Sequence, residues 1–325
     1  MRYREFGDTG MLVSEIGFGC SRIGGMFTKG DASDPIALLR LALEAGITFF
    51  DTADIYSEGE SESLVGRAFE GRRDELVIAT KGGYILPGQR KLLAKVKPLL
   101  RPVLRILPVK RESLPPSFVG TLSQDFSPTH LAKALEGSLR RLRTEYVDVY
   151  QLHSPPESIV AQEDWLETLA GFKQQGKVRA FGIAADSVED AGSYSALTQI
   201  SSLQFPLGLL DLGGLDTVLA GPRRSAGIIT RGCFGGGLLK DTLTSAQLQV
   251  LTPKWKRIQA FREQADLYGR SILELALQFN LCVPNAAVTL LGMRTKQQLS
   301  DNLRYLGASP LMKEESEGIL RSYTG

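Results

Sequence analysis

Short apolar segments of strand length alternate with helix-length segments along this chain, and that alternation constrains the fold more than any other feature. Continuous apolar runs are typical of parallel strands buried on both faces, and each parallel neighbour needs a crossover helix. The alternation therefore predicts an α/β protein folded as a (β/α)8 TIM barrel. The eight segments are IGFG (16–19), ITFF (47–50), LVIAT (76–80), VDVYQ (147–151), RAFGI (179–183), SSLQ (201–204), GIIT (227–230) and AVTLL (287–291).

The segments between these strands carry helix signals. Residues 35–46 have a periodic leucine and alanine face, begin after Asp34 as N-cap with Pro35 at the first helical position, and end at a glycine. The segments 129–142 and 163–176 predict the helices before the fourth and fifth strands. Each strand is thus followed by enough chain for the crossover that a parallel barrel requires.

Two turn-linked segments precede the first strand. YREFG and MLVSEI flank Asp8–Gly10 and predict an N-terminal β-hairpin that caps the barrel bottom. The chain has 325 residues, and α/β barrels commonly reach about 250 residues and more as one unit. We therefore expect residues 1–325 to form a single barrel domain.

Residues 84–123 interrupt the alternation and predict a long insertion after the third strand. Six prolines forbid a continuous helix, and the basic residues are opposed by the single acid Glu112. Loops after barrel strands surround the active-site mouth, so the insertion is either a lid for an anionic or bulky substrate or a solvated surface segment; a membrane-surface role is less favoured. The basic residues are Arg90, Lys91, Lys95, Lys97, Arg101, Arg105, Lys110 and Arg111, and the prolines are at 87, 98, 102, 108, 115 and 116.

Composition excludes several classes of function. Lys and Arg number 38 against 36 Asp and Glu, which leaves no basic excess for a nucleic-acid partner. Cys20, Cys233 and Cys282 are odd in number and lack CxxC spacing, which fits a reduced cytosol and no metal site. No stretch approaches the roughly 18 apolar residues of a membrane span, and the N-terminus has no signal-peptide core. We expect a cytoplasmic protein, either a monomer or a homo-oligomer.

Polar residues at the carboxyl ends of different strands are the candidate site, because these ends converge at the mouth of such a barrel. Asp51, Lys81, His153 and Gln204 follow or end four strands, and Tyr56 lies in the loop after Asp51. A tyrosine hydroxyl has a pKa of about 10, and a nearby ammonium lowers the pKa of such a hydroxyl. Lys81 can supply the ammonium, Asp51 can hold it charged, and His153 can donate a hydrogen bond to a substrate oxygen. The set predicts a site that polarises a carbonyl.

Four stretches of the chain resemble the aldo-keto reductase family and follow one another in the order of that barrel: FFDTADIYSEGESESLVGRAF, VIATKGG, SLRRLRTEYVDVYQLHSP and GKVRAFGI. The family's Asp, Tyr, Lys, His tetrad is carried over onto Asp51, Tyr56, Lys81 and His153. The resemblance implies hydride transfer from a nicotinamide to a carbonyl carbon, with Tyr56 giving its proton to the oxygen and His153 orienting the substrate. It implies a reductase of a small-molecule aldehyde or ketone, for which the basic insertion suggests a sugar-like or natural-product carbonyl.

Two further segments resemble the family's cofactor site and imply NADPH. TLLGMRTKQQLSDNL (289–303) is similar to the segment for the adenosine 2'-phosphate and pyrophosphate, where a turn precedes a helix whose N–H groups and dipole suit an anion. TRGCFGGGLLK (230–240) is similar to the segment after the seventh strand, in which Arg231 takes the place of a residue that stacks on the nicotinamide. The implied cofactor-binding residues are Ser21, Arg22, Asp51, Gln204, Arg231, Gly232, Cys233, Phe234, Gly235, Gly292, Arg294, Gln298, Asp301 and Asn302.

One position departs from the family pattern. The family usually has Ser-Asn after the fifth strand to hold the carboxamide, whereas this chain has Ala184-Ala185, and of that anchoring set only Gln204 remains. Each lost hydrogen bond to a neutral amide would weaken cofactor binding by roughly 0.5 to 1.5 kcal/mol.

Three alternative functions are weighed beside the reductase. The same chemistry run backwards is a sugar or alcohol dehydrogenase, and the sequence does not fix the direction. A nonenzymatic nicotinamide-binding regulatory subunit fits the relaxed Ala184-Ala185 positions, although the intact tetrad argues against it. A metal-dependent barrel hydrolase needs several histidine and carboxylate ligands at strand ends, and this chain has only His130 and His153.

Overall fold

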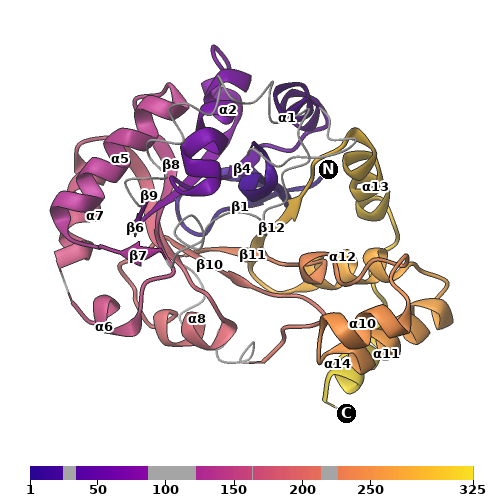
Figure 1. Cartoon of the computed structure of the whole chain (residues 1–325). Coiled ribbons are helices and arrows are strands. Elements are labelled where there is room, and N and C mark those ends of the chain that lie inside the picture. Colours follow the sequence, from indigo (N-terminus) through magenta and orange to yellow (C-terminus); the bar gives the residue numbers. More distant parts are fainter. Residues whose placement is uncertain (25–33, 87–121, 163, 214–225, 325) are drawn as a thin grey trace. The chain divides into compact units, whose positions relative to one another are not determined.

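Eight parallel strands form a closed barrel in the computed structural model, which describes residues 1–24, 34–86, 122–162, 164–213 and 226–324 (Figure 1). The strands hydrogen-bond in the order β10-β11-β12-β3-β4-β5-β8-β9. The predicted (β/α)8 TIM barrel is confirmed, and each of the eight apolar segments contributes one strand. The strands are β3 (Ile16–Gly19), β4 (Phe49–Asp51), β5 (Val77–Gly82), β8 (Val147–His153), β9 (Val178–Ala184), β10 (Ser202–Pro206), β11 (Gly227–Arg231) and β12 (Ala286–Gly292).

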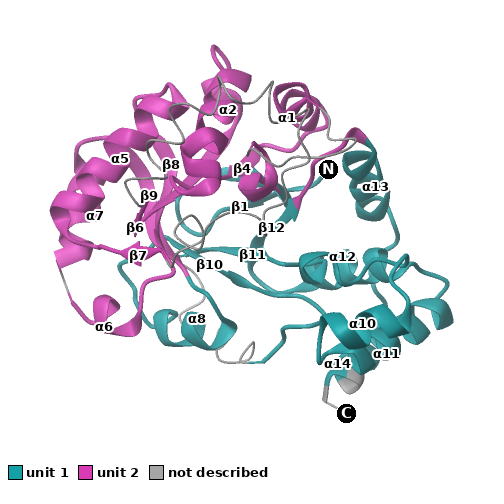
Figure 2. Ribbon diagram, viewed as in Figure 1, with its two compact units in different colours: residues 1–17, 185–291, 297–325 teal, residues 18–184, 292–296 magenta. Residues whose placement is uncertain are grey.

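The chain divides into two compact units, coloured in Figure 2. Unit 1 comprises residues 1–17, 185–291 and 297–325, and unit 2 comprises residues 18–184 and 292–296. That residues 1–325 form one barrel domain stays a prediction. The helices and short 3₁₀ turns of unit 2 are η1 (Cys20–Arg22), α1 (Pro35–Glu44), η2 (Tyr56–Gly59), α2 (Glu60–Ala68), η3 (Arg73–Glu75), α5 (Pro128–Leu142), α6 (Glu157–Val160) and α7 (Asp164–Gln174).

The helices of unit 2 form a row in which α1 packs on α2, α2 on α5 and α5 on α7 (Figure 1). The predicted helix start is confirmed at α1, and α5 begins at Pro128, one residue before the predicted segment 129–142. The Asp34 side chain accepts a hydrogen bond from the Ile36 amide (3.1 Å) and Ser127 accepts one from the His130 amide (3.3 Å), each with proline at the first helical position. These caps satisfy backbone donors that a helix N-terminus leaves unpaired.

A buried carboxylate fixes the amino ends of three neighbouring strands in unit 2. Asp148, on β8, is fully buried. It accepts hydrogen bonds from the Ile78 amide of β5 (2.8 Å), from Arg179 of β9 (2.7 Å) and from Arg73 (2.6 Å). Because two guanidinium groups and an amide surround it, the charge is compensated, and the strands enter the barrel in a defined register.

The predicted N-terminal hairpin is present in unit 1 as β1 (Tyr3–Glu5) and β2 (Leu12–Ser14), which pair antiparallel. Phe6 is fully buried, and its ring lies against Gly227, where a built Cβ would be 2.6 Å from the ring. The hairpin therefore covers the amino end of β11. The remaining elements of unit 1 are α8 (Val188–Tyr194), η5 (Gly235–Gly237), α10 (Ser245–Leu251), α11 (Trp255–Leu267), α12 (Ile272–Cys282), α13 (Lys296–Leu306) and α14 (Lys313–Thr324).

The two ends of the predicted insertion meet in a small antiparallel pair. The strand β6 (Tyr84–Ile85) pairs with β7 (Ser123–Gln124), with Tyr84 opposite Gln124. The predicted irregular course of the basic, proline-rich part falls on residues 87–121, which lie outside the described residues.

Within the ranges that the structure describes, no helix combines the length and the apolar character needed to cross a bilayer.

Candidate active site

Lys81 and Asp51 form a buried ion pair at the carboxyl ends of adjacent strands. Asp51 ends β4 and Lys81 is the penultimate residue of β5, and the strands pair with Asp51 opposite Ala79. The Lys81 Nζ donates to Asp51 Oδ1 at 2.6 Å and to the Thr52 carbonyl at 2.9 Å. Lys81 is 1% exposed and Asp51 4%. A lysine this deeply buried keeps its charge only beside a compensating anion, which Asp51 supplies.

Tyr56 and His153 lie beside this ion pair and remain half-buried. The Lys81 Nζ is 5.3 Å from the centroid of the Tyr56 ring. The Tyr56 and His153 rings meet edge to face, with centroids 5.7 Å apart. His153 is the last residue of β8, paired with Ala184 of β9. The structure thus brings together the four residues that the sequence predicts as the catalytic set, all within unit 2.

A tight turn directly after Tyr56 fixes its place. Ser57, Glu58 and Gly59 have successive positive φ values of 52°, 58° and 86°. Left-handed conformations are uncommon for residues with a side chain and persist where surrounding contacts hold them. The Tyr56 amide donates to the Ala53 carbonyl (3.1 Å), and the Ser57 hydroxyl donates to the Ile23 carbonyl (3.2 Å). The chain therefore turns sharply at the tyrosine and enters α2.

Behind Lys81 lies a second buried network that sequence reasoning missed. Glu62 is fully buried on α2, and it accepts hydrogen bonds from Thr80 (2.6 Å) and from Arg141 of α5 (2.6 Å). Burial and the Glu62 carboxylate raise the pKa of Asp54 to about 8, an effect that Arg141 only partly opposes. Burial, with Asp54 and Glu62 nearby, also raises the pKa of the Tyr150 hydroxyl well above its usual value. Neither Asp54 Oδ1 nor the Tyr150 hydroxyl has a hydrogen-bond partner among the described residues.

The only indication of this network in the sequence is that two of its acidic residues lie close to Tyr56. Glu62 and Asp54 stand in the same stretch as Tyr56, but a glutamate on a helix is ordinarily a surface residue, and its partner Arg141 is 79 positions away. Glu62 and Arg141 come together only because α2 packs on α5 in the folded chain.

Two residues at the base of the insertion also contact the site. The Tyr84 ring meets the His153 ring edge to face at 4.9 Å between centroids. The Gln124 amide donates to the carbonyls of His153 (3.1 Å) and Ser154 (2.8 Å). The sequence placed the insertion beside the mouth without singling out these two residues, which are the ones that border His153.

The family model described as "Aldo/keto reductase family" matches residues 15–322. The chain belongs to the aldo/keto reductase family. Proteins of this family are oxidoreductases that generally use a nicotinamide cofactor and act on small-molecule carbonyl compounds.

Similar proteins cover nearly the whole chain. The "Aldo-keto reductase YhdN" of Bacillus subtilis is 29% identical over 92% of this chain and 87% of its own length. An L-galactose dehydrogenase of Arabidopsis thaliana is 25% identical over 98% of this chain and 93% of its own. Among solved structures, the holo form of aldo-keto reductase AKR11C1 from Bacillus halodurans is 25% identical, with a TM-score of 0.77 over 99% of this chain and 96% of that one.

The predicted cofactor residues of this aldo/keto reductase are divided between the two units. Those in unit 2 other than Asp51 are all exposed: Ser21, Arg22, Gly292 and Arg294. Those in unit 1 are Gln204, which is fully buried at the centre of β10, residues 231–235, which begin at the last residue of β11, and Gln298, Asp301 and Asn302 on α13. That these residues bind one cofactor stays a prediction.

Arg231 has defined protein partners within unit 1. Its Nη2 donates to the Ala185 carbonyl at 2.9 Å and lies 3.6 Å from an Asp186 carboxylate oxygen. The backbone of Ala185 in turn donates to the Gln204 carbonyl (2.7 Å). Arg231 thus binds the segment in which this aldo/keto reductase carries Ala184-Ala185 instead of the family's Ser-Asn.

Cys20, Cys233 and Cys282 differ in their surroundings. Cys233 is 1% exposed, and burial raises the pKa of its thiol. Cys20 is fully buried, and burial together with the nearby Asp51 carboxylate raises the pKa of its thiol. Cys282 is exposed. In the part of the chain that the structure describes, no group of three or more His, Cys, Asp or Glu side chains is arranged to hold a metal.

Proposed function

We propose that this aldo/keto reductase reduces an aldehyde or ketone to an alcohol with NADPH, and that Tyr56 is the proton donor. The observation that supports this proposal is the arrangement around the tyrosine ring. The buried Lys81 ammonium lies 5.3 Å from the centroid of this ring, and the centroid of the His153 imidazole lies 5.7 Å from it, while the tyrosine itself stays partly accessible to a substrate.

Each side chain of the tetrad has a distinct task in this proposal. The Tyr56 hydroxyl donates its proton to the carbonyl oxygen, and the Lys81 ammonium stabilises the phenolate that remains. Asp51 holds Lys81 charged and in place through the 2.6 Å contact. His153 donates a hydrogen bond to the same substrate oxygen and orients the carbonyl, and the Tyr84 ring fixes the plane of the imidazole.

The residues present fit a nicotinamide dinucleotide. Gly232 and Gly292 have no atom within 4 Å of a built Cβ, which leaves room for a phosphate to approach the backbone at these positions. Arg294 is an exposed guanidinium in the turn before α13, suited to a 2'-phosphate, which favours NADPH over NADH. NADPH, when bound, supplies the hydride for the carbonyl carbon. Gln204 and the backbone of Ala185 are the residues proposed to border its carboxamide.

The oxidative direction is a second candidate, favoured by one relative. The Arabidopsis protein that is 25% identical over most of this chain is a dehydrogenase of L-galactose. The same tetrad serves both directions, because a tyrosine that gives a proton to an alkoxide on reduction takes it back from an alcohol on oxidation. The proposed substrate class is therefore a sugar-like or natural-product carbonyl, or the matching alcohol.

The test follows NADPH absorbance with a panel of aldehydes, ketones and keto-sugars, together with the reverse assay on alcohols and sugars with NADP⁺. We expect turnover by the unaltered chain and a loss of about a hundredfold or more in Tyr56→Phe, since general acid catalysis contributes on that scale. Running NADH in parallel measures the cofactor preference, which Arg294→Gln should weaken.

The matched control is Tyr146→Phe. Tyr146 is a half-buried tyrosine of the same unit that stacks under Arg73 and donates to Asp74 at 3.4 Å, away from the tetrad. Its variant should keep full turnover. If the unaltered chain binds NADPH in a fluorescence titration but turns over no member of the panel in either direction, the enzymatic proposal is wrong and a nicotinamide-binding regulatory role replaces it.

A further inference from the structure

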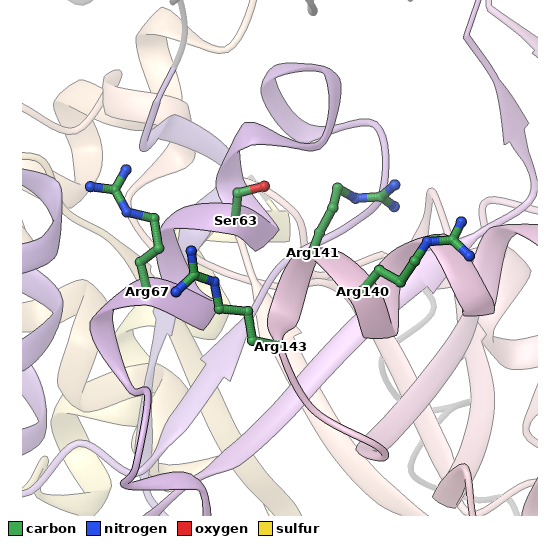
Figure 3. A pocket seen from close by; sticks show the side chains of 6 residues that line it. Ser63, Arg67, Arg140, Arg141 and Arg143 are labelled. Atoms are coloured by element: carbon green, nitrogen blue, oxygen red, sulfur yellow. The ribbon is translucent and has the colours of Figure 1, made fainter.

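A basic pocket lies on the helical layer of unit 2, lined by residues of α2 and α5 that the tetrad does not use (Figure 3). Its volume is about 330 Å³. Figure 3 shows Ser63 and Arg67 extending from α2, Arg140 and Arg141 from the end of α5, and Arg143 from the residue that follows α5. The lining residues are Ser63, Arg67, Gly137, Arg140, Arg141 and Arg143.

The four guanidinium groups of this pocket are only partly neutralised. Arg141 is paired with the buried Glu62 at 2.6 Å, and Arg143 with Glu70 at 2.7 Å. Arg67 and Arg140 are exposed, and neither has an acidic partner among the residues that the structure describes. The pocket therefore carries about two positive charges in excess, on two side chains from different helices, Arg67 of α2 and Arg140 of α5.

Close packing joins α2 and α5, the two helices that carry most of the pocket. A built Cβ on Gly66 of α2 would lie 2.5 Å from the Leu142 carbonyl oxygen, so the two helix backbones nearly touch there. A built Cβ on Gly137 would lie 3.0 Å from Nη1 of Arg141, so the absence of a side chain at Gly137 leaves room for that guanidinium. Arg141 is further fixed by its bond to Ser138 (3.3 Å). At least one of the four donors is thus positioned before any ligand arrives.

We propose that this pocket binds a small phosphate-bearing anion. Guanidinium groups present planar pairs of N–H donors that match phosphate oxygens, and clustered arginines with unneutralised charge are a common means by which proteins recognise phosphate. The Ser63 hydroxyl adds a neutral polar group to the lining. A volume of about 330 Å³ suits a phosphate with a small attached group, because small-molecule sites begin at about 300 Å³. The site is separate from the proposed cofactor residues, since none of them lines it.

The test titrates the whole protein with inorganic phosphate, pyrophosphate and a hexose phosphate by calorimetry at low ionic strength. The key variant is Arg67→Gln with Arg140→Gln, which removes the two uncompensated charges and touches neither the ion pair of Arg141 nor the tetrad. We expect its affinity to fall by about tenfold or more, because it loses charge-assisted contacts to the anion.

Two matched variants make the result specific. Lys133→Gln with Lys173→Gln removes two exposed positive charges from α5 and α7 of the same unit, outside the pocket, and should keep the binding event. Arg294→Gln, which weakens the proposed cofactor site, should also keep it. The proposal is overturned if the unaltered chain binds none of the three probes, or if the two double variants lose affinity equally. In either case the arginines serve only to favour the carboxyl end of α5 through its helix dipole.

Discussion

Asp54 is a buried carboxyl group whose surroundings favour its neutral form. Burial and the adjacent Glu62 carboxylate raise the pKa of Asp54 from 3.8 to about 8, and Arg141 only partly opposes them. Between these two values the folded chain keeps a proton that the unfolded chain has lost. The folded state therefore binds more protons than the unfolded state in this window, so the free energy of unfolding falls as pH rises through it.

We predict that Asp54→Asn reduces this pH dependence. The variant keeps a neutral side chain of the same shape, so its free energy of unfolding should fall less than that of the unaltered chain between pH 5 and pH 8.5. Urea denaturation at several pH values measures the difference. Asp266→Asn, at an exposed position of α11, is the control and should follow the unaltered chain. Parallel curves for the unaltered chain and Asp54→Asn would contradict the raised pKa.

At the scale of elements, the closest approach of α2 and α5 depends on one glycine. Gly66 is in the interior of α2, where glycine costs about 1 kcal/mol relative to alanine. The structure gives the reason, because any side chain there would meet the Leu142 carbonyl oxygen at 2.5 Å. A backbone atom cannot move aside as a flexible side chain does, so the two helices would have to separate.

We expect Gly66→Ala to destabilise the fold by about 1–3 kcal/mol, since overpacking costs more than the gain in helix propensity. The matched control is Gly171→Ala on α7, where a built Cβ has no atom within 4 Å. That variant should be neutral or stabilising by up to about 1 kcal/mol. Midpoints of urea denaturation compare the two. Equal effects in both helices would show that the contact with Leu142 is unimportant.

The regular elements could be predicted from the sequence because their signals are local. Apolar runs of four or five residues marked every barrel strand, and Asp34 with Pro35 marked the start of α1. The role of Gly66 and the ion pair of Glu62 with Arg141 could not be predicted, because each depends on a partner more than 70 positions away. The left-handed conformations of Ser57 and Glu58 likewise could not be predicted, because neither residue is a glycine.

The residues of the candidate site also divide into those with a local signal in the sequence and those without one. Asp51, Lys81 and His153 could be placed together because they stand at the ends of strands that any such barrel brings to one mouth. Tyr56 needed the resemblance to a known family as well, since a tyrosine five residues past a strand is not marked by its spacing. Tyr84 and Gln124 contact His153 only because the base of the insertion folds back as a strand pair, which no pattern in the sequence indicates.

At the scale of the whole molecule, one arginine joins the start of the chain to its last third. Arg4 of β1 donates to the Ala286 carbonyl (2.7 Å), 282 positions away, and to the Leu281 carbonyl (2.9 Å). It also pairs with the buried Glu15 at 3.2 Å. The hairpin is therefore tied to the end of α12 and the beginning of β12, which closes the amino-terminal side of unit 1.

We predict that Arg4→Met lowers the free energy of unfolding by about 2–4 kcal/mol, because it leaves Glu15 with fewer partners and two carbonyls without their donor. The control is Arg304→Met on α13, whose side chain is 67% exposed and pairs with Asp301 at 3.4 Å. Exposed pairs of this kind contribute about 0–1 kcal/mol. Chemical denaturation distinguishes the two, and equal losses would mean that the contacts of Arg4 contribute no more than an exposed ion pair.

All four side chains of the proposed catalytic tetrad come from residues 51–153, within a single unit. This placement has a consequence for heredity. A recombination between two related barrels near residue 185 would pass the complete set on from one parent, while β10, β11 and the segment after β11 would come from the other. Exchange of the carboxyl-terminal half would then change which ligands are bound, while the proposed catalytic residues stay the same.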